Sequence, residues 1–518
     1  MSKPAIFYDV STLCPTPGIE ARATDSYLRC ELEKRFPSDA LLSVTVTENS
    51  TGAYRGPSSF ISRFFGAGKE ITDLPPYYEA VIRRSTGKYS EEIIVWCPKA
   101  WNGRFAGTAN GGTCTGGRTA ITDPGEYQRG WTLPYALRNG FTAATAYAGN
   151  ADGLKDYIID SKTGAFNREL YDNWRLNTTH SMTLYGKAVA EILHGRRVEY
   201  SYMNGGSGGG RQCLMEAQNF PEDYDGIWAS CPAINWHSFI TAGLWPQAVM
   251  NEYNRLLTPE KNAYLSKRAR DMSGGDAAFY SLKRIPDADA ARFVGENSPG
   301  GVITEEDALI MNEIWTGPCD EDGTPLWYAC APGVVNWQKY IPIGTYYYPL
   351  FYKITKRTKP FLLGTKHARW ITGEPDNSFK TIKKQDVIKL LRLGEEKLSD
   401  CQGNNPDLTA FMRHGGKLMI DHGTDDPLIP CQGTLDYYEK LLDFFGEKER
   451  LDSFVRLYIT PGDNHGNCIG NGPGLTQTTC IRTMLDWVEN GKAPGELPTV
   501  RVNKKTYEII GTGTVKPE

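Results

Sequence analysis

The sequence predicts an α/β fold in which helices flank a mostly parallel sheet and one large segment is inserted. A β-rich run, a glycine-rich turn and a helix-forming run follow one another at 198–220, the order of an α/β crossover. Strand and helix patterns alternate again from residue 416. The chain has 518 residues, and a single hydrophobic core stops growing at ~250–300. A second compact unit is therefore expected.

The individual elements follow from residue patterns. A helix is predicted over 179–194, because apolar residues recur there at helical spacing. Another helix is predicted to begin near Arg211 and to run through Phe220. The other predicted elements are strands and turns within 76–109, strands at 198–203, 417–420 and 455–459, and helices at 434–445 and 480–489.

Residues 237–413 differ in composition and in residue pattern from the chain on either side. Aromatic residues crowd this stretch, for example at 346–352, and the regular alternation of strands and helices fades. We therefore expect an inserted cap, or lid domain, at 237–413. The main α/β domain then comprises 1–236 and 414–518, with 1–75 as an N-terminal extension packed on it.

Charge and hydropathy exclude several classes of partner. The chain carries 57 basic and 61 acidic residues, a net charge of −4, which does not favour nucleic acid or an anionic membrane. No apolar run approaches the ~20 residues that span a bilayer. The first residues do not resemble a signal peptide, so a cytoplasmic location is expected, or a secreted one if the chain is a processed form. The expected partner is a small molecule, and the oligomeric state is not predicted.

Twelve cysteines are too few for a disulfide scaffold in a chain of this length. None forms a Cys-x-x-Cys pair, which argues against a zinc ribbon. Most are expected to be small buried apolar residues. Cys319 with Cys330, or Cys468 with Cys480, are pairs that would bridge if the protein were exported.

The run Gly205-Gly206-Ser207-Gly208-Gly209 fits the pattern Gly-x-Ser-x-Gly of a nucleophile elbow. In such an elbow the serine sits on a sharp strand-to-helix turn, and small flanking residues let strand and helix approach. A flexible linker has a similar composition, but a β-rich run precedes this one and a helix-forming run follows. A phosphate-binding loop is disfavoured because no Gly-Lys-Ser/Thr follows.

A nucleophilic serine needs a base, and the chain has seven histidines. In α/β-hydrolases the order along the chain is Ser, Asp or Glu, then His. His465 follows a predicted strand and fits this order. His422 ends a strand and is expected to satisfy a backbone group. His180 and His194 precede the serine, and a position on a helix surface is expected for both. No His-Glu-x-x-His or similar cluster indicates zinc.

The acid that orients the base should follow a strand between Ser207 and His465. The segment 422–430 supplies two candidates, Asp425 and Asp426. Asp425 can instead cap the turn, since Asp-Pro stretches initiate turns. The residues alone leave both candidates open.

Several segments together resemble the tannase and feruloyl esterase family of α/β-hydrolases. They are 101–105 (WNGRF), 200–212 (YSYMNGGSGGGRQ), 216–218 (EAQ), 220–227 (FPEDYDGI), 422–430 (HGTDDPLIP), 436–439 (DYYE), 461–462 (PG) and 491–494 (GKAP). The resemblance covers about 75–235 and 415–495 well and the predicted cap poorly. It implies a serine carboxylester hydrolase with Asp426 as the acid. It also implies an oxyanion hole formed by a backbone N–H from Gly111, Gly112 or Thr113 together with that of Gly208.

Two departures from the family pattern stand out. The family usually carries a cysteine before the serine and another after the histidine, joined as a disulfide, and these positions are Gly206 and Gly466 here. The family's cap often holds calcium in an aspartate-rich loop, and here only 270–276 resembles a remnant of it. Asp320 to Gly323 is expected to form a turn. We therefore expect no metal and no cofactor.

The expected reaction is hydrolysis of an ester of an aromatic, phenolic acid. The resemblance implies a galloyl or hydroxycinnamoyl ester, as in tannases and feruloyl esterases. The alternatives are a hydrolase of another aromatic ester, of terephthalate type or a depside, and a catalytically silent ligand-binding protein on the same fold. A peptidase or thioesterase is a further alternative.

Overall fold

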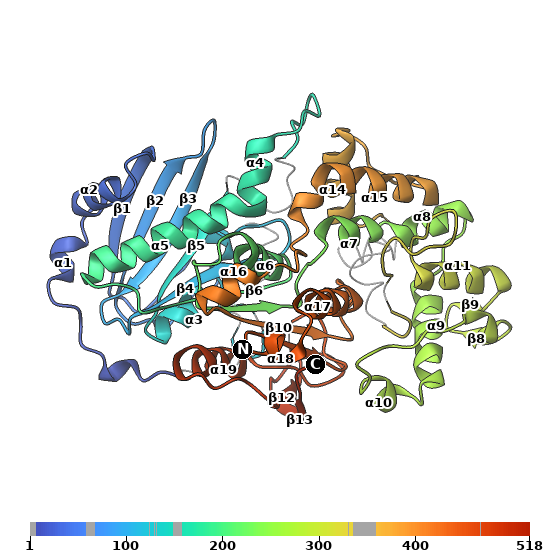
Figure 1. Cartoon of the computed structure of the whole chain (residues 1–518). Coiled ribbons are helices and arrows are strands. Elements are labelled where there is room, and N and C mark those ends of the chain that lie inside the picture. The colour runs from blue at the N-terminus through green and yellow to red at the C-terminus, as the bar shows by residue number, and fades with distance from the viewer. Residues whose placement is uncertain are drawn as a thin grey trace.

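The computed structural model of the chain describes residues 7–58, 68–123, 125–128, 130, 132–148, 158–329, 331–334, 359–466 and 468–518. These described residues form a nine-stranded sheet in the order β1-β2-β3-β5-β4-β6-β7-β10-β11 (Figure 1). The pairs among β1, β2, β3 and β5 are antiparallel, and all pairs from β5 through β11 are parallel. The strands are β1 (Leu41–Asn49), β2 (Tyr77–Ser85), β3 (Ser90–Pro98), β4 (Arg104–Ala109), β5 (Thr142–Tyr147), β6 (Tyr200–Gly206), β7 (Gly226–Ser230), β10 (Lys417–Gly423) and β11 (Val455–Thr460).

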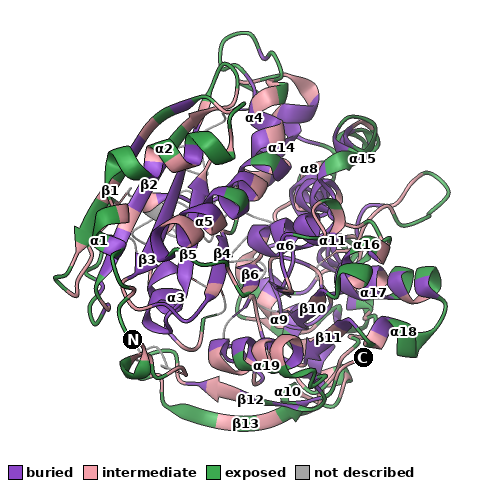
Figure 2. Cartoon of the chain, turned by 60° about the vertical axis from the view of Figure 1, so that its left-hand side comes forward, coloured by how far each residue is buried: buried purple, intermediate pink, exposed green. Residues whose placement is uncertain are grey.

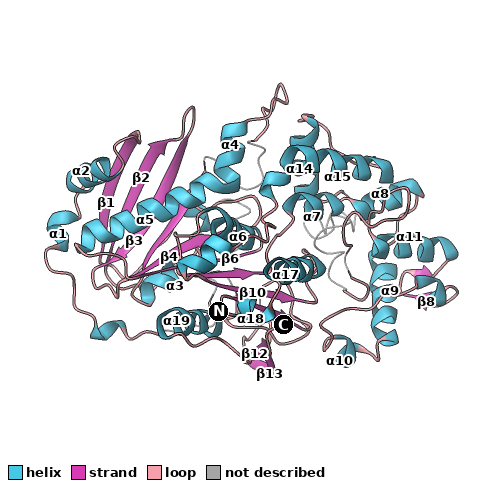
Figure 3. Cartoon of the chain, viewed as in Figure 1, coloured by secondary structure: helices cyan, strands magenta, loops and turns pink. Residues whose placement is uncertain are grey.

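Helices cover both faces of this sheet (Figure 3). One face packs against α5 (Thr178–His194), α6 (Gly208–Asn219) and α17 (Gln432–Phe445). The opposite face packs against α3 (Leu133–Arg138) and α19 (Gln477–Asn490). Because helices cover both faces, the central strands are buried and are apolar along most of their length. Figure 2 shows these strands and α6 as buried. The predicted α/β-hydrolase core is confirmed.

The predicted elements differ from the observed ones mainly at their ends. Helix α6 begins at Gly208, three residues before the predicted start near Arg211. Glycines are poor helix formers, so the sequence pattern did not include them. Their small size is required here, because a Cβ at Gly209 would lie 2.7 Å from the Ala109 carbonyl oxygen, and one at Gly210 would lie 2.7 Å from the Cα of Pro232.

A mainly helical unit is inserted between β7 and β10 and lies on the right in Figure 1. It has its own hydrophobic core, to which residues 158–174 also contribute. The aromatic run 346–352 lies outside the described residues, and the exact limits 237–413 stay a prediction. The described elements of this unit are α7 (Trp236–Ala242), α8 (Trp245–Glu252), α9 (Pro259–Met272), α10 (Asp276–Phe279), β8 (Asn297–Ser298), β9 (Gly301–Val302), α11 (Glu305–Thr316), α14 (Leu362–Thr372) and α15 (Lys384–Leu398). The helix that follows, α16 (Thr409–His414), packs instead in the core of the main sheet.

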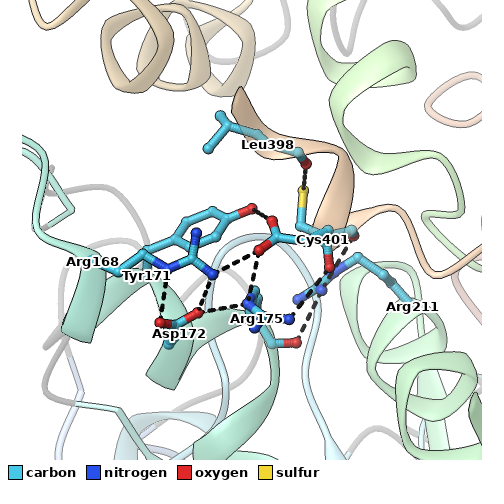
Figure 4. A network of polar contacts seen from close by, with 8 residues as sticks. Arg168, Tyr171, Asp172, Arg175, Arg211, Leu398 and Cys401 are labelled. Atoms are coloured by element: carbon cyan, nitrogen blue, oxygen red, sulfur yellow. Dashed lines mark hydrogen bonds and ion pairs between the residues drawn. The ribbon is translucent and has the colours of Figure 1, made fainter. Parts of the chain in front are cut away.

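A polar network joins the end of the inserted unit to helix α6 (Figure 4). Arg211 of α6 is buried and donates from Nη1 to the carbonyl oxygens of Arg175 and Cys401 at 3.2 and 3.5 Å. Its guanidinium lies 4.3 Å from the ring centroid of Trp174, a favourable cation–π arrangement. Asp400 accepts from Tyr171 Oη at 2.6 Å. These contacts hold α6 in a defined position relative to the end of the insertion.

Two further findings concern targeting and cysteines. No helix in the described ranges is long and apolar enough to cross a membrane, and the cytoplasmic location stays a prediction. Among the described cysteines no disulfide is formed. Cys468 and Cys480 are therefore not joined to each other, and Cys330 lies outside the described residues.

Candidate active site

Ser207 occupies a sharp turn between β6 and α6. Its backbone has φ 61° and ψ −125°, a conformation that costs energy for a residue with a side chain and is frequent at functional sites. Its N–H donates to the Ser230 carbonyl oxygen at 3.0 Å. A Cβ at Gly205 would lie 2.5 Å from the Gly209 carbonyl carbon. The two flanking glycines are thus required by close backbone packing, as the elbow pattern predicts.

The loop after β4 lies directly against this turn. A Cβ at Gly111 would be 3.5 Å from Ser207 Cβ and 3.8 Å from its Oγ, and one at Gly208 would be 2.4 Å from the Gly112 carbonyl oxygen. Gln212 donates to the Asn110 carbonyl oxygen at 3.0 Å and so ties the loop to α6. The structure therefore brings all the predicted oxyanion-hole segments together beside Ser207.

A lysine of the inserted unit also reaches this loop. Lys366 of α14 is 2% exposed, and its Nζ donates to Thr113 Oγ1 at 3.2 Å. Its ammonium lies 5.8 Å from the ring centroid of Trp370. The insertion thus places a buried cation next to the loop that contacts Ser207.

His465 is hydrogen-bonded to Asp426 at the carboxyl ends of β10 and β11. The distance between Nδ1 of His465 and Oδ2 of Asp426 is 2.7 Å. A carboxylate only accepts, so Nδ1 donates, and the neutral ring keeps Nε2 as its basic nitrogen. Burial alone would lower the pKa of His465, but Asp426 and Cys231 raise it well above its usual value.

Asp426 is fully surrounded by donors. Its Oδ1 accepts from the N–H groups of Leu428 and Ile429 at 2.8 and 3.1 Å. Its Oδ2 also lies 3.2 Å from Nε2 of His422. Burial alone would raise the pKa of Asp426, but His465 and His422 hold it below its usual range. Asp426 is therefore a buried anion with several donors around it.

Asp425 points elsewhere. Its Oδ2 accepts from Asn471 at 2.7 Å, and its N–H donates to the Asp463 carbonyl oxygen at 3.0 Å. Burial raises the pKa of Asp425 to about 7. Of the two aspartates that the residues left open, Asp426 is the one hydrogen-bonded to His465.

Three histidine expectations change with the structure. His422 bonds to the Ile429 carbonyl oxygen as expected, but it also contacts Asp426 and the Thr434 hydroxyl. The surface position expected for His194 is wrong: it is buried, with Nδ1 2.7 Å from Thr16 Oγ1. The surface position expected for His180 is only partly right, because it is half-buried, with Nδ1 2.7 Å from Asp223 Oδ2.

Three acidic residues of the insertion are bonded to neighbouring basic side chains or backbone N–H groups. Asp271 pairs with Lys267 at 2.9 Å, and Asp276 pairs with Arg270 at 2.7 Å. Asp320 accepts from the N–H groups of Asp322 and Thr324, which closes the predicted turn. The stretch 270–276 is thus occupied by ion pairs with basic side chains.

Comparison with known proteins agrees with this geometry. Residues 81–272 and 376–516 match the family described as tannase and feruloyl esterase. The chain belongs to the tannase and feruloyl esterase family. It is therefore a carboxylic ester hydrolase.

Relatives of this family member are found among fungal enzymes. A probable feruloyl esterase of Arthroderma benhamiae is 30% identical over 429 residues, which cover 78% of this chain and 75% of the relative. Feruloyl esterase B of Aspergillus niger is 26% identical over 434 residues, covering 79% of this chain and 76% of that protein.

Solved structures of the family share the fold. Feruloyl esterase B from Aspergillus oryzae superposes with a TM-score of 0.73 at 19% identity and covers 95% of both chains. Tannin acyl hydrolase from Aspergillus niger superposes with a TM-score of 0.73 at 19% identity, over 99% of this chain and 93% of that one. The α/β core and the insertion therefore follow the architecture of these proteins.

In this tannase and feruloyl esterase family member, the position after His465 is a glycine next to a thiol. A Cβ at Gly466 would lie 3.1 Å from Cys231 Sγ and 4.0 Å from Ser230 Oγ. Ser230 also accepts the Ser207 N–H. The end of β7 therefore borders both the serine turn and the histidine loop. Sequence reasoning did not single out Cys231, Gln212 or Lys366 as parts of the site.

Proposed function

We propose that the chain hydrolyses esters of aromatic, phenolic acids, galloyl or hydroxycinnamoyl, through an acyl-enzyme on Ser207. His465 is the base and Asp426 orients it. The observation that carries the proposal is the 2.7 Å bond from His465 to the buried Asp426, at the sheet edge where β6 ends in the Ser207 turn.

The reaction begins when Ser207 Oγ attacks the ester carbonyl carbon and His465 Nε2 takes the hydroxyl proton. The oxyanion that forms accepts hydrogen bonds from the N–H of Gly208 and from an N–H of the Gly111–Thr113 loop. The intermediate then expels the alcohol, which receives the proton from His465. Water repeats the sequence on the acyl-enzyme and releases the acid.

Asp426 contributes in two ways. Its hydrogen bond to Nδ1–H selects the tautomer in which Nε2 is basic, and its negative charge stabilises the imidazolium that forms during each step. The two backbone N–H donors and His422 hold the carboxylate in place.

The aromatic acyl group is supported by an apolar pocket between the inserted unit and the loop that follows Asp426. Its lining includes Phe239, Trp245, Tyr328 and Leu428. Flat aromatic side chains pack favourably on a planar ring. The similarity to a probable feruloyl esterase and to a tannin acyl hydrolase supports the same class of substrate.

A substrate panel tests the proposal. We expect kcat/KM for methyl ferulate or methyl gallate to exceed that for ethyl butyrate by about 100-fold, or about 2.7 kcal/mol of transition-state binding. Turnover of a terephthalate ester or a depside alone would support the alternative aromatic esters. Absence of hydrolysis of every ester would contradict the proposal and favour a ligand-binding protein.

A matched pair of variants tests the pocket. Phe239→Leu removes an aromatic ring from its lining, and Phe444→Leu makes the same change at a side chain of α17 that is 48% exposed. We expect only Phe239→Leu to lower the preference for methyl ferulate over ethyl butyrate. Equal preferences in both variants would place the acyl group elsewhere.

A further inference from the structure

Cys231 lies beside the imidazole of His465. The Cys231 sulfur, a ring nitrogen of His465 and a carboxylate oxygen of Asp426 all lie within 4.8 Å of one another. The thiol is 2% exposed, and it lies 3.1 Å from where a Cβ at Gly466 would be. The His465 ring therefore has two polar neighbours, Asp426 after β10 and Cys231 after β7.

The backbone holds this thiol in a defined place. Cys231 has φ 35°, a left-handed value that costs energy for a residue with a Cβ. Its N–H donates to the Asp421 carbonyl oxygen at 2.6 Å. The preceding residue, Ser230, accepts the Ser207 N–H. The strained residue is thus fixed between β10 and the serine turn.

We propose that Cys231 is a positioning residue for the base, whose sulfur hydrogen-bonds to the His465 ring and stabilises its protonated form. The inference rests on the proposed role of His465. A protonated imidazole has two N–H donors, and Asp426 accepts one of them. A sulfur beside the ring is an acceptor for the other, so the resting ring is held when substrate is absent.

The direction of the expected effect agrees with the local charges. Burial lowers the pKa of His465, whereas Asp426 and then Cys231 raise it, and the balance lies well above the usual value. The other titratable groups at this site are Asp426, which is bonded to the ring, and His422, whose Nε2 lies 3.2 Å from Asp426 Oδ2. They are unchanged in variants of Cys231, so a difference between variants reports the thiol.

The pH profile of kcat/KM tests the inference. A base works when deprotonated, so a raised pKa of His465 places the acid limb at higher pH. Cys231→Ala removes the partner and is expected to move the acid limb to lower pH. Cys231→Ser keeps a hydrogen-bonding group without the polarisable sulfur and is expected to lie between. Cys213→Ser, at a cysteine that is also fully buried, is expected to leave the limb in place.

A second measurement needs no substrate. The proton of the Nδ1–H···Oδ2 bond is followed by its downfield proton NMR resonance while the parent chain and Cys231→Ala are each titrated. We expect the midpoint to lie at lower pH in Cys231→Ala.

The outcomes decide between two roles. A lower midpoint and a lower acid limb support the positioning role, even if the phenolic substrate assignment fails. An acid limb and an NMR midpoint that are both the same with and without the thiol would overturn it and leave Cys231 as a packing residue.

Discussion

His465 and Asp426 are joined by a 2.7 Å bond between Nδ1 and Oδ2, across 39 positions of sequence. The two residues lie on loops that follow the adjacent parallel strands β11 and β10. The carboxyl ends of parallel strands meet at one edge of a sheet, where ligands of α/β proteins bind. The serine turn ends β6 at the same edge, so each partner comes from a separate strand end.

The two neighbouring aspartates are expected to differ sharply on substitution. Asp426→Asn should lower kcat by about 10³–10⁴-fold, because an amide favours the wrong tautomer and does not stabilise the imidazolium. Asp425→Asn is the matched control and should change kcat by less than about tenfold. Steady-state kinetics with one ester measure both. The reverse ranking would show that Asp425 orients the base.

Asp425 should also make stability depend on pH. Its pKa of about 7 in the folded protein, set mainly by burial, is above the unfolded value of about 4. The folded state then holds more protons between these values, so stability falls as pH rises from 4 to 7. Asp425→Asn should remove this part of the fall. Melting temperatures of both chains across pH 4–8 test it, and parallel curves would contradict it.

Gly208 is expected to tolerate no side chain. A Cβ there would lie 2.4 Å from the Gly112 carbonyl oxygen, so Gly208→Ala must push the oxyanion loop away. Loss of one oxyanion donor costs about 10²–10³-fold in kcat, and we expect a loss of that size with little change in KM. Gly495→Ala, where nothing lies within 4 Å of the added Cβ, should behave as the parent. A fully active Gly208→Ala would exclude this loop from the hole.

Lys366 and Thr113 should act as a pair. Removing either end of their 3.2 Å bond loosens the loop, so Lys366→Met and Thr113→Val should each lower kcat. The double variant should lose less than the sum, with a coupling of about 1.5–3 kcal/mol for a hydrogen bond to a charged group. A double-mutant cycle on kcat/KM measures this coupling. Strict additivity would mean that the lysine acts on something other than Thr113.

Local patterns predicted much of the core. Helix α5 follows from apolar periodicity, strands β10 and β11 follow from short, mostly apolar runs, and the elbow follows from Gly205, Ser207 and Gly209. Only the family resemblance favoured Asp426 over Asp425, because both stand in the same turn. The remaining partners could not be predicted from local sequence. Cys231 is 234 positions from His465 and is not part of any local motif.

Contacts between the insertion and the core could not be predicted either, because they join residues far apart in the sequence. The bond from Lys366 to Thr113 joins residues 253 positions apart, and no periodicity encodes such a meeting. The start of α6 was missed because Gly208 to Gly210 are unfavourable helix formers whose value is their small size. The network around Arg211 likewise depends on Trp174 and Cys401, which come together only in the fold.

The role of Ser207 as the nucleophile is tested most directly by the site at which a fluorophosphonate labels the protein. The reagent reacts with a serine whose proton is removed by a positioned base. Peptide mass spectrometry should find one adduct, on Ser207, formed in proportion to the loss of methyl ferulate hydrolysis. Ser207→Ala should take up no label, and His465→Ala should label far more slowly. Labelling at another serine would contradict the assignment of Ser207 as the nucleophile. Full activity of Ser207→Ala, or of the protein labelled at Ser207, would contradict it as well.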